Sequence, residues 1–340
     1  MIERAVAATG LPEDQGNPLR PANLGDFVGQ NRFVGNMRVF MAASRERKES
    51  LDHVLLSGPP GLGKTTFAHL ISRELGAPLK ATSAPVIEKT GDMAALLSGL
   101  QEGEILFIDE IHRLKPVIEE VLYPALEDFA LDLQLGQGPT ARTVKIALPR
   151  FTLVGATTRP GSLTAPLLSR FGILGQFEFY GVDDLSVIAR RNAALLGLGL
   201  AESGVGELAR RCRGTPRILN RLLRRVRDFA QVKKASAVDA ELCAWSLDQM
   251  EIDRYGLDSL DRRLLDTLIR SFGGGPVGLD NLAVSLGEDS ETLEDMVEPY
   301  LIQAGFLQRT PRGRIATRQA YQYLGLKGGE PSLFDPPANP

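Results

Sequence analysis

A glycine-rich stretch at residues 58–66, GPPGLGKTT, constrains the fold of this chain more than any other segment. It matches the pattern of Gly, four variable residues and Gly-Lys-Ser/Thr at Gly58, Gly63, Lys64 and Thr65. Glycines allow the backbone to turn so that several N–H groups point at phosphate oxygens. Lys64 can reach the terminal phosphates of a nucleotide, and the Thr65 hydroxyl can ligate Mg²⁺.

The sequence on either side of this loop fits a strand–loop–helix unit. Val54–Leu56 is typical of a short buried strand, and Phe67–Glu74 is typical of a helix, whose N-terminus favours an anion. A glycine-rich turn without a ligand is the disfavoured interpretation once both elements flank the motif. We therefore expect the chain to bind ATP together with Mg²⁺.

A second motif, ILFIDE at residues 105–110, is an apolar run that ends in two acids. At the end of a strand, Asp109 would lie beside Mg²⁺ and Glu110 near the terminal phosphate, where it can orient or deprotonate the attacking water. Buried strands commonly end in acids because strand ends meet solvent, but the position after a phosphate-binding loop favours hydrolysis. His112 is either a coupling residue or a structural polar contact.

Two further motifs follow in the order found in AAA+ ATPases. The apolar run Leu153–Ala156 is followed by Thr157 and Thr158, whose hydroxyls either contact the terminal phosphate or the water, or cap the next element. Arg170 is either an exposed surface residue or an arginine finger that projects into the nucleotide site of a neighbouring subunit. A finger supplied by a neighbour requires an oligomer.

A fourth motif, GTPR at residues 214–217, opens a helix in the second half of the chain. Thr215 is expected to cap that helix, and Pro216 suits its first turn. Arg217 can then fold back onto the phosphates. The later arginines of this helix are more typical of a solvated or subunit-facing surface.

The pattern of apolar runs divides the chain into parts. Residues 1–181 alternate strands and helices, which predicts an α/β nucleotide-binding domain, a parallel sheet with helices on both faces, after a flexible N-terminus of about 15 residues. Residues 182–254 are helical only and are expected to form an all-α lid. Residues 255–329 show three helical stretches and a basic hairpin, which is the plan of a winged-helix DNA-binding domain. The tail, residues 330–340, is expected to be disordered.

Composition excludes few classes of protein. The net charge of −3 does not suggest a nucleic-acid binder, but residues 210–227 and 300–329 contain arginines and no acid. The two cysteines, Cys212 and Cys243, lack metal-ligand spacing and are expected to be buried thiols rather than a disulfide. Without an apolar run long enough for a membrane span or a secretion signal, the expected location is the cytoplasm.

With these motifs in place, the chain resembles the RuvB family, the bacterial ATPase motors that drive branch migration of Holliday junctions in recombination and repair. The resemblance runs from about Leu19 to Leu326. It is carried by blocks well beyond the generic ATPase motifs. Four of them are far more specific than a phosphate-binding loop: RFGI (170–173), RGTPRILNRLLRRVRDFA (213–230), FGGGPVGLDNLA (272–283) and EPYLIQAGFLQRTPRGR (298–314).

The resemblance assigns roles to individual residues. It implies catalytic roles for Lys64, the acidic pair Asp109 and Glu110, the first sensor Thr158, the finger Arg170 and the second sensor Arg217. It implies nucleotide contacts by Leu19 and Arg20 at the adenine, by Gly61, Lys64, Thr65 and Thr66 at the phosphates, and by Glu127, Asp128, Phe129, Arg170, Tyr180 and Arg217. Thr65 and Asp109 are the implied Mg²⁺ ligands.

The resemblance also implies partners. The chain is expected to form a homo-hexamer around duplex DNA, with Arg309 and Arg314 on the DNA backbone and no sequence specificity. Ser290 stands where the family often has an arginine, so one phosphate contact is in doubt. The hairpin Leu131–Leu148, turning at residues 136–139, resembles the element that docks a RuvA-like junction-binding protein; a RuvC-like resolvase is a further implied partner.

Two alternatives share the nucleotide motifs. A clamp loader, or another AAA+ remodeller that acts on protein, leaves the acid-free hairpin at residues 300–329 unexplained. An ATP-gated DNA-binding switch does not need the positioned carboxylate of Glu110.

Overall fold

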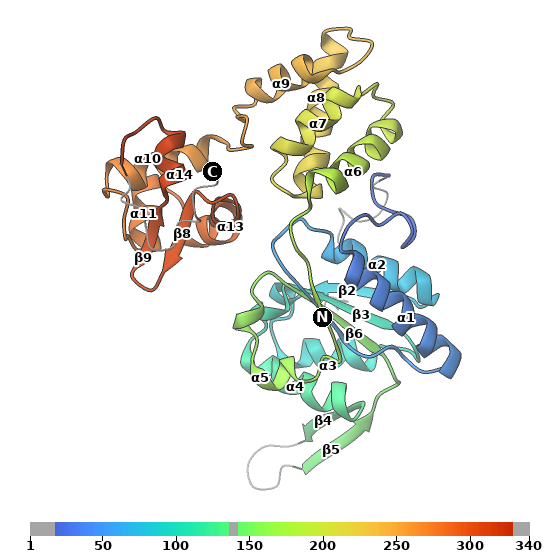
Figure 1. The fold of residues 1–340 in the computed structure, drawn as a ribbon. Coiled ribbons are helices and arrows are strands. Elements are labelled where there is room, and N and C mark those ends of the chain that lie inside the picture. Colours follow the sequence, from blue (N-terminus) through green and yellow to red (C-terminus); the bar gives the residue numbers. More distant parts are fainter. Residues whose placement is uncertain (1–17, 136–141, 329–340) are drawn as a thin grey trace, which may run out of the picture. The chain divides into compact units, whose positions relative to one another are not determined.

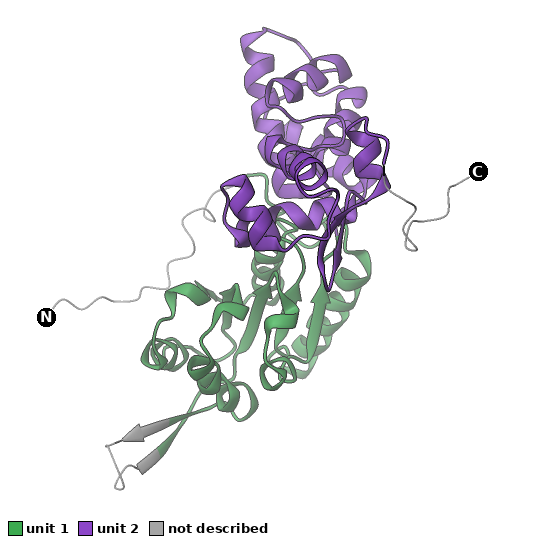
Figure 2. Cartoon of the chain, turned by 90° about the vertical axis from the view of Figure 1, so that its left-hand side faces the viewer, with its two compact units in different colours: residues 1–178 green, residues 179–340 purple. Residues whose placement is uncertain are grey.

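The computed structural model describes residues 18–135 and 142–328. The expected flexible N-terminus, the tip of the hairpin at 136–139 and the expected disordered tail at 330–340 therefore lie outside the described residues. The chain divides into two compact units, Met1–Glu178 and Phe179–Pro340, which are coloured separately in Figure 2.

The first unit is built on a parallel sheet, which within the described residues has five strands in the order β2-β3-β6-β1-β7 (Figure 1). The three expected strands are confirmed as β1 (Val54–Ser57), β3 (Ile105–Asp109) and β6 (Thr152–Thr157). Two strands at the sheet edges were not expected, β2 (Leu79–Ser83) and β7 (Ile173–Gln176). Because β6 pairs with both β1 and β3, the three central strands end side by side at one edge.

Helices cover both faces of this sheet. On one face, α1 (Asn31–Arg47) packs against α2 (Lys64–Leu75), and α2 packs against β3 and β6. On the other face lie α3 (Thr90–Ser98), α4 (Pro116–Glu127) and α5 (Ala165–Leu168). Alternate strand residues face opposite sides of a sheet, and Leu106 and Ile108 accordingly pack with the core of this second helical layer.

Within the first unit, α4 is followed by an antiparallel hairpin that is separate from the main sheet. Its strands, β4 (Ala130–Leu135) and β5 (Arg142–Ala147), pair Leu131 with Ile146, which confirms the expected hairpin. Leu131 is buried, as a strand face packed on the domain would require, whereas the side chains of Leu133 and Leu135 lie outside the described residues.

The second unit begins with four consecutive helices and ends with helices around a short hairpin. The first group comprises α6 (Val182–Leu195), α7 (Glu202–Arg211), α8 (Pro216–Val232) and α9 (Ala240–Gln249). The second group comprises α10 (Ser259–Arg270), α11 (Leu279–Leu286), α12 (Ser290–Thr292), α13 (Glu298–Gln303), β8 (Leu307–Thr310), β9 (Gly313–Ala316) and α14 (Arg318–Tyr323). The expected order of helices and hairpin is confirmed.

One expected helix is not continuous. Residues 291–304 were expected to form a single helix, but a π-helical turn at Leu293–Val297 separates α12 from α13. Pro299 stands at the start of α13, where it has no N–H to donate to the preceding turn. The wider turn accommodates this missing hydrogen bond.

The two cysteines are both free and buried, as expected. Burial raises the pKa of the Cys212 thiol and of the Cys243 thiol to about 12, so both are protonated at neutral pH. They therefore act as small apolar groups of the second unit.

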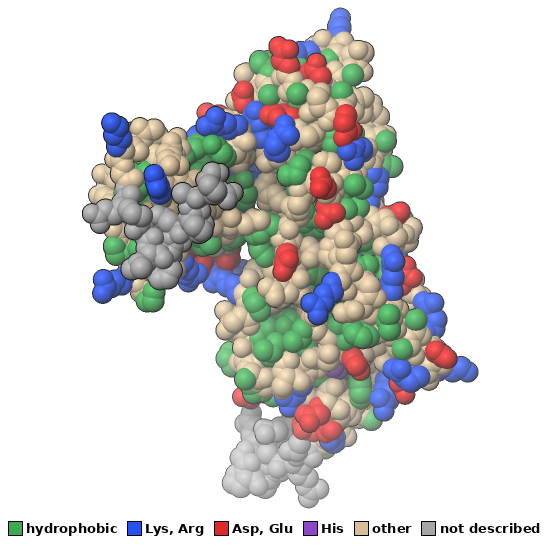
Figure 3. Space-filling model, viewed as in Figure 1, with side chains coloured by type: hydrophobic (Ala, Val, Ile, Leu, Met, Phe, Trp, Pro, Cys, Tyr) green, Lys and Arg blue, Asp and Glu red, His purple; other side chains and the backbone are tan. Residues whose placement is uncertain are grey.

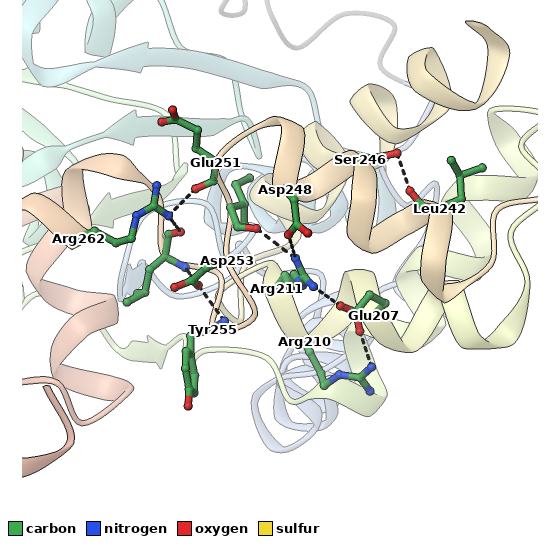
Figure 4. A network of polar contacts seen from close by, with 12 residues as sticks. Glu207, Arg210, Arg211, Leu242, Ser246, Asp248, Glu251, Asp253, Tyr255 and Arg262 are labelled. Carbon is green, nitrogen blue, oxygen red and sulfur yellow. Dashed lines mark hydrogen bonds and ion pairs between the residues drawn. The ribbon is translucent and has the colours of Figure 1, made fainter. Parts of the chain in front are cut away.

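Charged side chains of both signs are interspersed over the face of the molecule shown in Figure 3. Several arginines of the acid-free segment at residues 210–227 pair with acids that lie outside this segment. Arg211 binds Glu207 of its own helix and Asp248 at the end of α9, at 2.6 and 2.7 Å (Figure 4). A run of arginines without acids in the sequence is therefore not an uncompensated basic surface.

Candidate active site

The glycine-rich loop joins the end of β1 to the first turn of α2. Gly58, Gly61 and Gly63 have φ angles of 136°, 79° and 100°, which side chains disfavour. A Cβ atom on Gly58 would lie 2.3 Å from the carbonyl oxygen of Phe177, so the loop also packs too closely on the chain for any other residue. The result is a ring of backbone N–H groups at a helix N-terminus, which suits phosphate.

Lys64 is the first residue of α2, and its side chain curls back over the loop. Its ammonium group donates to the carbonyl oxygens of Gly58 and Pro59 at 2.7 and 2.9 Å. The side chain is buried against the loop, with 7% of its surface exposed. Lys64 is thus held where the phosphates of a nucleotide in the loop would lie, as the motif predicts.

The two expected Mg²⁺ ligands, Thr65 and Asp109, lie close together although they belong to α2 and β3. The Thr65 hydroxyl is 3.5 Å from Asp109 Oδ2. Burial, and then the neighbouring charge of Glu110, raise the pKa of Asp109. A divalent cation between the hydroxyl and the carboxylate would offset both effects, so these residues fit Mg²⁺.

The described residues hold no group of three or more His, Cys, Asp or Glu side chains that could bind a metal. A site with Thr65 and Asp109 as its protein ligands leaves the remaining positions to phosphate and water, which is the usual arrangement for Mg²⁺.

Glu110 is held in a single orientation at the end of β3. Its backbone is left-handed, with φ at 50°, which is uncommon for a residue with a side chain and recurs at functional sites. The Thr158 hydroxyl donates to Glu110 Oε2 at 3.2 Å, and His112 Nδ1 lies 3.2 Å from the same oxygen. The Thr157 hydroxyl lies 3.0 Å from His112 Nδ1. The structure thus brings the acidic strand and the threonine strand together at one carboxylate.

Arg170 and Glu127 lie in the first unit, at the end of α5 and of α4. Arg170 Nη2 forms an ion pair with Glu127 Oε2 at 2.8 Å. Asp128 instead pairs with Lys145 of β5 at 2.7 Å, and Phe129 packs edge-on against Phe151. The three residues Glu127–Phe129 are therefore occupied by contacts within the unit, and their predicted contact with a nucleotide stays a prediction.

The residues expected at the adenine precede α1. Leu19 is buried with 1% of its surface exposed, whereas Arg20 is half-buried. Gly61 and Thr66, expected at the phosphates, are half-buried in the loop and the first turn of α2. Their nucleotide contacts stay predictions.

Tyr180 and Arg217 belong to the second unit. The Tyr180 backbone N–H donates to the carbonyl oxygen of Gly214 at 2.9 Å, which joins the start of this unit to the loop before α8. Arg217 is exposed in the first turn of α8, and Pro216 opens the helix as expected. The expected cap by Thr215 is wrong, because its hydroxyl donates to the carbonyl oxygen of Arg213 instead of accepting from the helix.

The two arginines expected on DNA differ in burial. Arg309 of β8 is largely exposed and pairs with Glu294 at 2.8 Å. Arg314 of β9 is buried and forms a bidentate ion pair with Glu298, at 2.6 and 3.0 Å. Both acids precede the hairpin in the chain, so its acid-free sequence did not reveal them. The Ser290 hydroxyl donates to Asp280 at 2.6 Å.

Two residues of α4 that the sequence did not single out, Tyr123 and Glu119, lie four residues apart on one face of the helix. Tyr123 contacts Arg170, and its hydroxyl contacts Glu119. The helical period of four was the available signal, but it does not identify a partner from α5.

None of the described helices is long and apolar enough to cross a membrane.

Family models match most of the chain. Residues 19–177 match the Holliday junction DNA helicase RuvB P-loop domain, residues 180–253 the RuvB AAA lid domain, and residues 254–325 the RuvB C-terminal winged helix domain. The fold class expected from sequence, an AAA+ domain followed by a lid and a winged helix, is thereby confirmed.

Solved structures of Thermotoga maritima RuvB are similar over nearly the whole chain. The Holliday junction branch migration motor of that organism is 48% identical, with a TM-score of 0.85, and the match covers 92% of this chain and 99% of that one. Its K64R and R170A variants are each 47% identical, with TM-scores of 0.86 and 0.85, over 92% of this chain and 99% and 100% of theirs. This chain has the same residue types, Lys64 and Arg170, at those numbers.

Proposed function

Because this chain belongs to the RuvB family of Holliday junction branch migration motors, we propose that it is an ATP-driven motor that forms a ring on duplex DNA and drives branch migration with a junction-binding partner. Membership of this P-loop AAA+ family implies ATP hydrolysis. The ring, the duplex substrate and the partner are the parts that we propose.

One observation carries the proposal: Glu110 is a fixed carboxylate at the edge of the sheet that also bears the phosphate-binding loop. The Thr158 hydroxyl and His112 hold the same carboxylate oxygen, both at 3.2 Å. That leaves the other oxygen to accept a proton from water as it attacks the terminal phosphate. A protein that used ATP only to change conformation would not need this arrangement.

The other residues of the site bind and orient the nucleotide. The backbone of the loop and Lys64 hold the phosphates, while Thr65 and Asp109 hold Mg²⁺, which would neutralise charge on the phosphate oxygens. We assign to Leu19, Arg20, Tyr180 and Arg217 the remaining nucleotide contacts. Arg170 from a neighbouring copy then stabilises charge that develops on the terminal phosphate.

The winged helix, residues 254–325, is the proposed DNA-binding part. The exposed guanidinium of Arg309 supports a backbone contact, because its partner Glu294 is only a surface ion pair and can be exchanged for phosphate. Arg314 can reach DNA only if its buried pair with Glu298 opens, so we propose that it mainly holds β9 on α13. Binding through phosphate contacts is expected to be non-specific and to weaken steeply with salt.

The proposed partners use other surfaces. The hairpin exposes the apolar side chains of Val144 and Ile146 on β5, each to 40%, which supports docking of a RuvA-like protein there. A hexamer places each Arg170 at a neighbour's site. We extend the proposal to a RuvC-like resolvase and to the cytoplasm on family resemblance alone.

The test is branch migration of a synthetic four-way junction with ATP and Mg²⁺, with and without a junction-binding partner. The Glu110→Gln variant keeps the size of the side chain but cannot take up the proton, so it should bind ATP and junction and release no strands. ATP-dependent junction binding without strand products in the unaltered protein would favour a switch, and indifference to the junction would favour a remodeller that acts on protein.

A further inference from the structure

The guanidinium of Arg170 has three contacts besides its ion pair, and all come from α4 or from α5. Its Cζ atom lies 4.7 Å from the centre of the Tyr123 ring, which is cation–π distance. Nε donates to the Tyr123 carbonyl oxygen at 3.4 Å, and Nη1 donates to the Pro166 carbonyl oxygen at 2.6 Å. The Tyr123 ring thus covers one face of the guanidinium, and two backbone carbonyl oxygens bind two of its nitrogen atoms.

Tyr123 is itself fixed at its far end. Its hydroxyl lies 3.1 Å from the Thr164 hydroxyl and 3.3 Å from Glu119 Oε2. The Thr164 hydroxyl donates to Glu119 at 2.6 Å and accepts from the backbone N–H of Leu167, so it also caps α5. Glu119 is only 3% exposed, and a buried carboxylate keeps its partners because losing them is costly.

These bonds connect α4 to the start of α5, the helix that ends just before Arg170. The ring therefore cannot rotate away from the guanidinium without breaking the contacts of its hydroxyl with Glu119 and Thr164. A stacked ring restricts the planar guanidinium to one plane while leaving its outer N–H groups available.

The remaining nitrogen, Nη2, has a different kind of partner. It pairs with Glu127, whose side chain is 66% exposed, against 22% for Arg170. Exposed ion pairs contribute only about 0–1 kcal/mol, so a phosphate oxygen, which carries more charge, can displace this carboxylate. Glu127 thus occupies a position from which an anion can approach the held guanidinium.

We propose that Tyr123 is the positioning residue of the arginine finger, and that Glu127 marks the place that a neighbour's terminal phosphate takes. The inference rests on the proposed function, because it needs a second copy of this chain to supply the phosphate. In this proposal Tyr123 acts only through Arg170.

The experiment compares Tyr123→Met, which keeps bulk without a ring face, with Tyr123→Phe, which keeps the ring and loses the hydroxyl. Misplacing a catalytic group by about 1 Å costs on the order of 10²-fold in rate. We expect Tyr123→Met to lower kcat for ATP by roughly ten- to a hundredfold with little change in KM, since the finger acts in the transition state. Tyr123→Phe keeps the ring face and loses only the hydroxyl that fixes it, so its rate should fall by less than that of Tyr123→Met.

Mixing variants adds a readout that a general folding defect would not produce. Glu110→Gln chains have a defective site but an intact finger, and Tyr123→Met chains have the reverse. In mixed rings, the intact nucleotide site of a Tyr123→Met chain can receive the intact finger of a neighbouring Glu110→Gln chain. The ATPase rate of the mixture should therefore exceed the sum of the rates of the two pure variants. No recovery in mixed rings, or unchanged kcat in pure Tyr123→Met rings, would overturn the proposal.

Arg170→Ala is the reference variant. If it hydrolyses ATP normally, the finger itself, and with it the ring mechanism, is wrong, whatever Tyr123 does. If Arg170→Ala is inactive and is rescued by mixing while Tyr123→Met is not, only the role of Tyr123 is wrong. If Tyr123→Met does not fold, Tyr123→Leu and the Tyr123→Phe rate take its place in the same comparison.

Discussion

Two arginines of this chain, Arg170 in the first unit and Arg213 in the second, have the same kinds of partner in opposite settings. Each stacks on a tyrosine ring, at 4.7 Å from Tyr123 and 5.6 Å from Tyr300, and each pairs with acid. The side chain of Arg170 is 22% exposed and that of Arg213 is 9% exposed. The exposed Glu127 can be replaced by another anion at Arg170, whereas the buried Asp261 stays bound to Arg213.

The cluster around Arg213 joins the lid to the winged helix within the second unit. Arg213 Nε donates to the Gly256 carbonyl oxygen at 2.6 Å, and Nη2 lies 2.6 Å from both Asp258 and Asp261. Asp261 is fully buried and Asp258 caps α10. In Figure 4, Arg262 of α10 also donates to the carbonyl oxygen of Glu251, which strengthens the same connection, whereas Arg211 joins α7 to Asp248 of α9 within the lid.

Arg213 also lies four residues before Arg217, on the loop that opens α8. If Arg217 moved when the terminal phosphate is lost, the buried Arg213 cluster would carry that movement from the lid to the winged helix. Arg170, by contrast, can give up Glu127 for a new anion without disturbing its unit. Exposure, rather than the residue types, sets these two behaviours.

The largest effect is expected for Arg170→Ala. Arginine fingers contribute on the order of 10³-fold or more to the rate of phosphoryl transfer, so kcat for ATP should fall by about that factor. The midpoint of urea unfolding should move less than for Arg213→Ala, because the loss of Arg170 leaves no buried charge without its counter-ion. Steady-state ATPase assays and urea titration on the same preparation check both parts, and a large loss of stability would remove the contrast with Arg213.

Arg213→Ala should have the reverse profile. Above the Asp261 pKa of about 7 it leaves this carboxylate buried without its counter-ion, and breaking a buried ion pair in this way costs about 3–5 kcal/mol of unfolding free energy. Chemical unfolding of the full chain, monitored by Trp245 fluorescence, measures this loss, and Arg213→Lys is the control that keeps the charge but not the planar fork. A loss below about 1 kcal/mol would mean that the Arg213 cluster stabilises the fold no more than the exposed Arg170–Glu127 ion pair does.

The same cluster predicts a pH dependence of stability. Burial raises the pKa of Asp261 to about 7, against opposing effects of Arg213. In the unfolded chain the group titrates near its usual value of about 3.9. Between these values the folded state keeps a proton that the unfolded state has lost, so unfolding free energy should fall as pH rises from about 4 to 7.

Burial by itself would raise the pKa of the neighbouring Asp258, but the charge of Arg213 and hydrogen bonds from backbone N–H groups outweigh it and lower that pKa. Asp258 therefore titrates below its usual range and does not contribute to the fall in stability between about pH 4 and 7. Asp261→Asn should flatten the fall in stability between about pH 4 and 7. Urea midpoints measured across that range would contradict the assignment if the slope is the same in both proteins.

The smallest effect is expected for Glu127→Gln. Removing the exchangeable partner of Arg170 should raise the ATPase rate, by no more than about fivefold, because an exposed ion pair contributes at most about 1 kcal/mol. Glu49→Gln, which breaks the exposed pair with Arg47 in the same unit instead, is the matched control. A rate that falls steeply would show that Glu127 acts on the nucleotide directly, as the family resemblance also allows.

The sheet of the first unit shows which elements could be read from sequence. The central strands β1, β3 and β6 are buried on both faces and appear as continuous apolar runs. The edge strands β2 and β7 bury only part of their residues, so LKATS and ILGQ lack a run or a strong alternation. They become strands because a paired neighbour supplies hydrogen bonds.

The site divides in the same way. The sequence alone determined the phosphate-binding loop, the acidic pair and the threonine strand, because each function is carried by residues adjacent in the chain whose backbone shape follows from local glycines and strand ends. Only the tertiary structure decided that Arg314 binds Glu298, that Arg213 binds Asp261 and that Tyr123 holds Arg170. Those partners come from elements distant in the chain, and whether a charge is free to meet a ligand depends on burial, which packing sets.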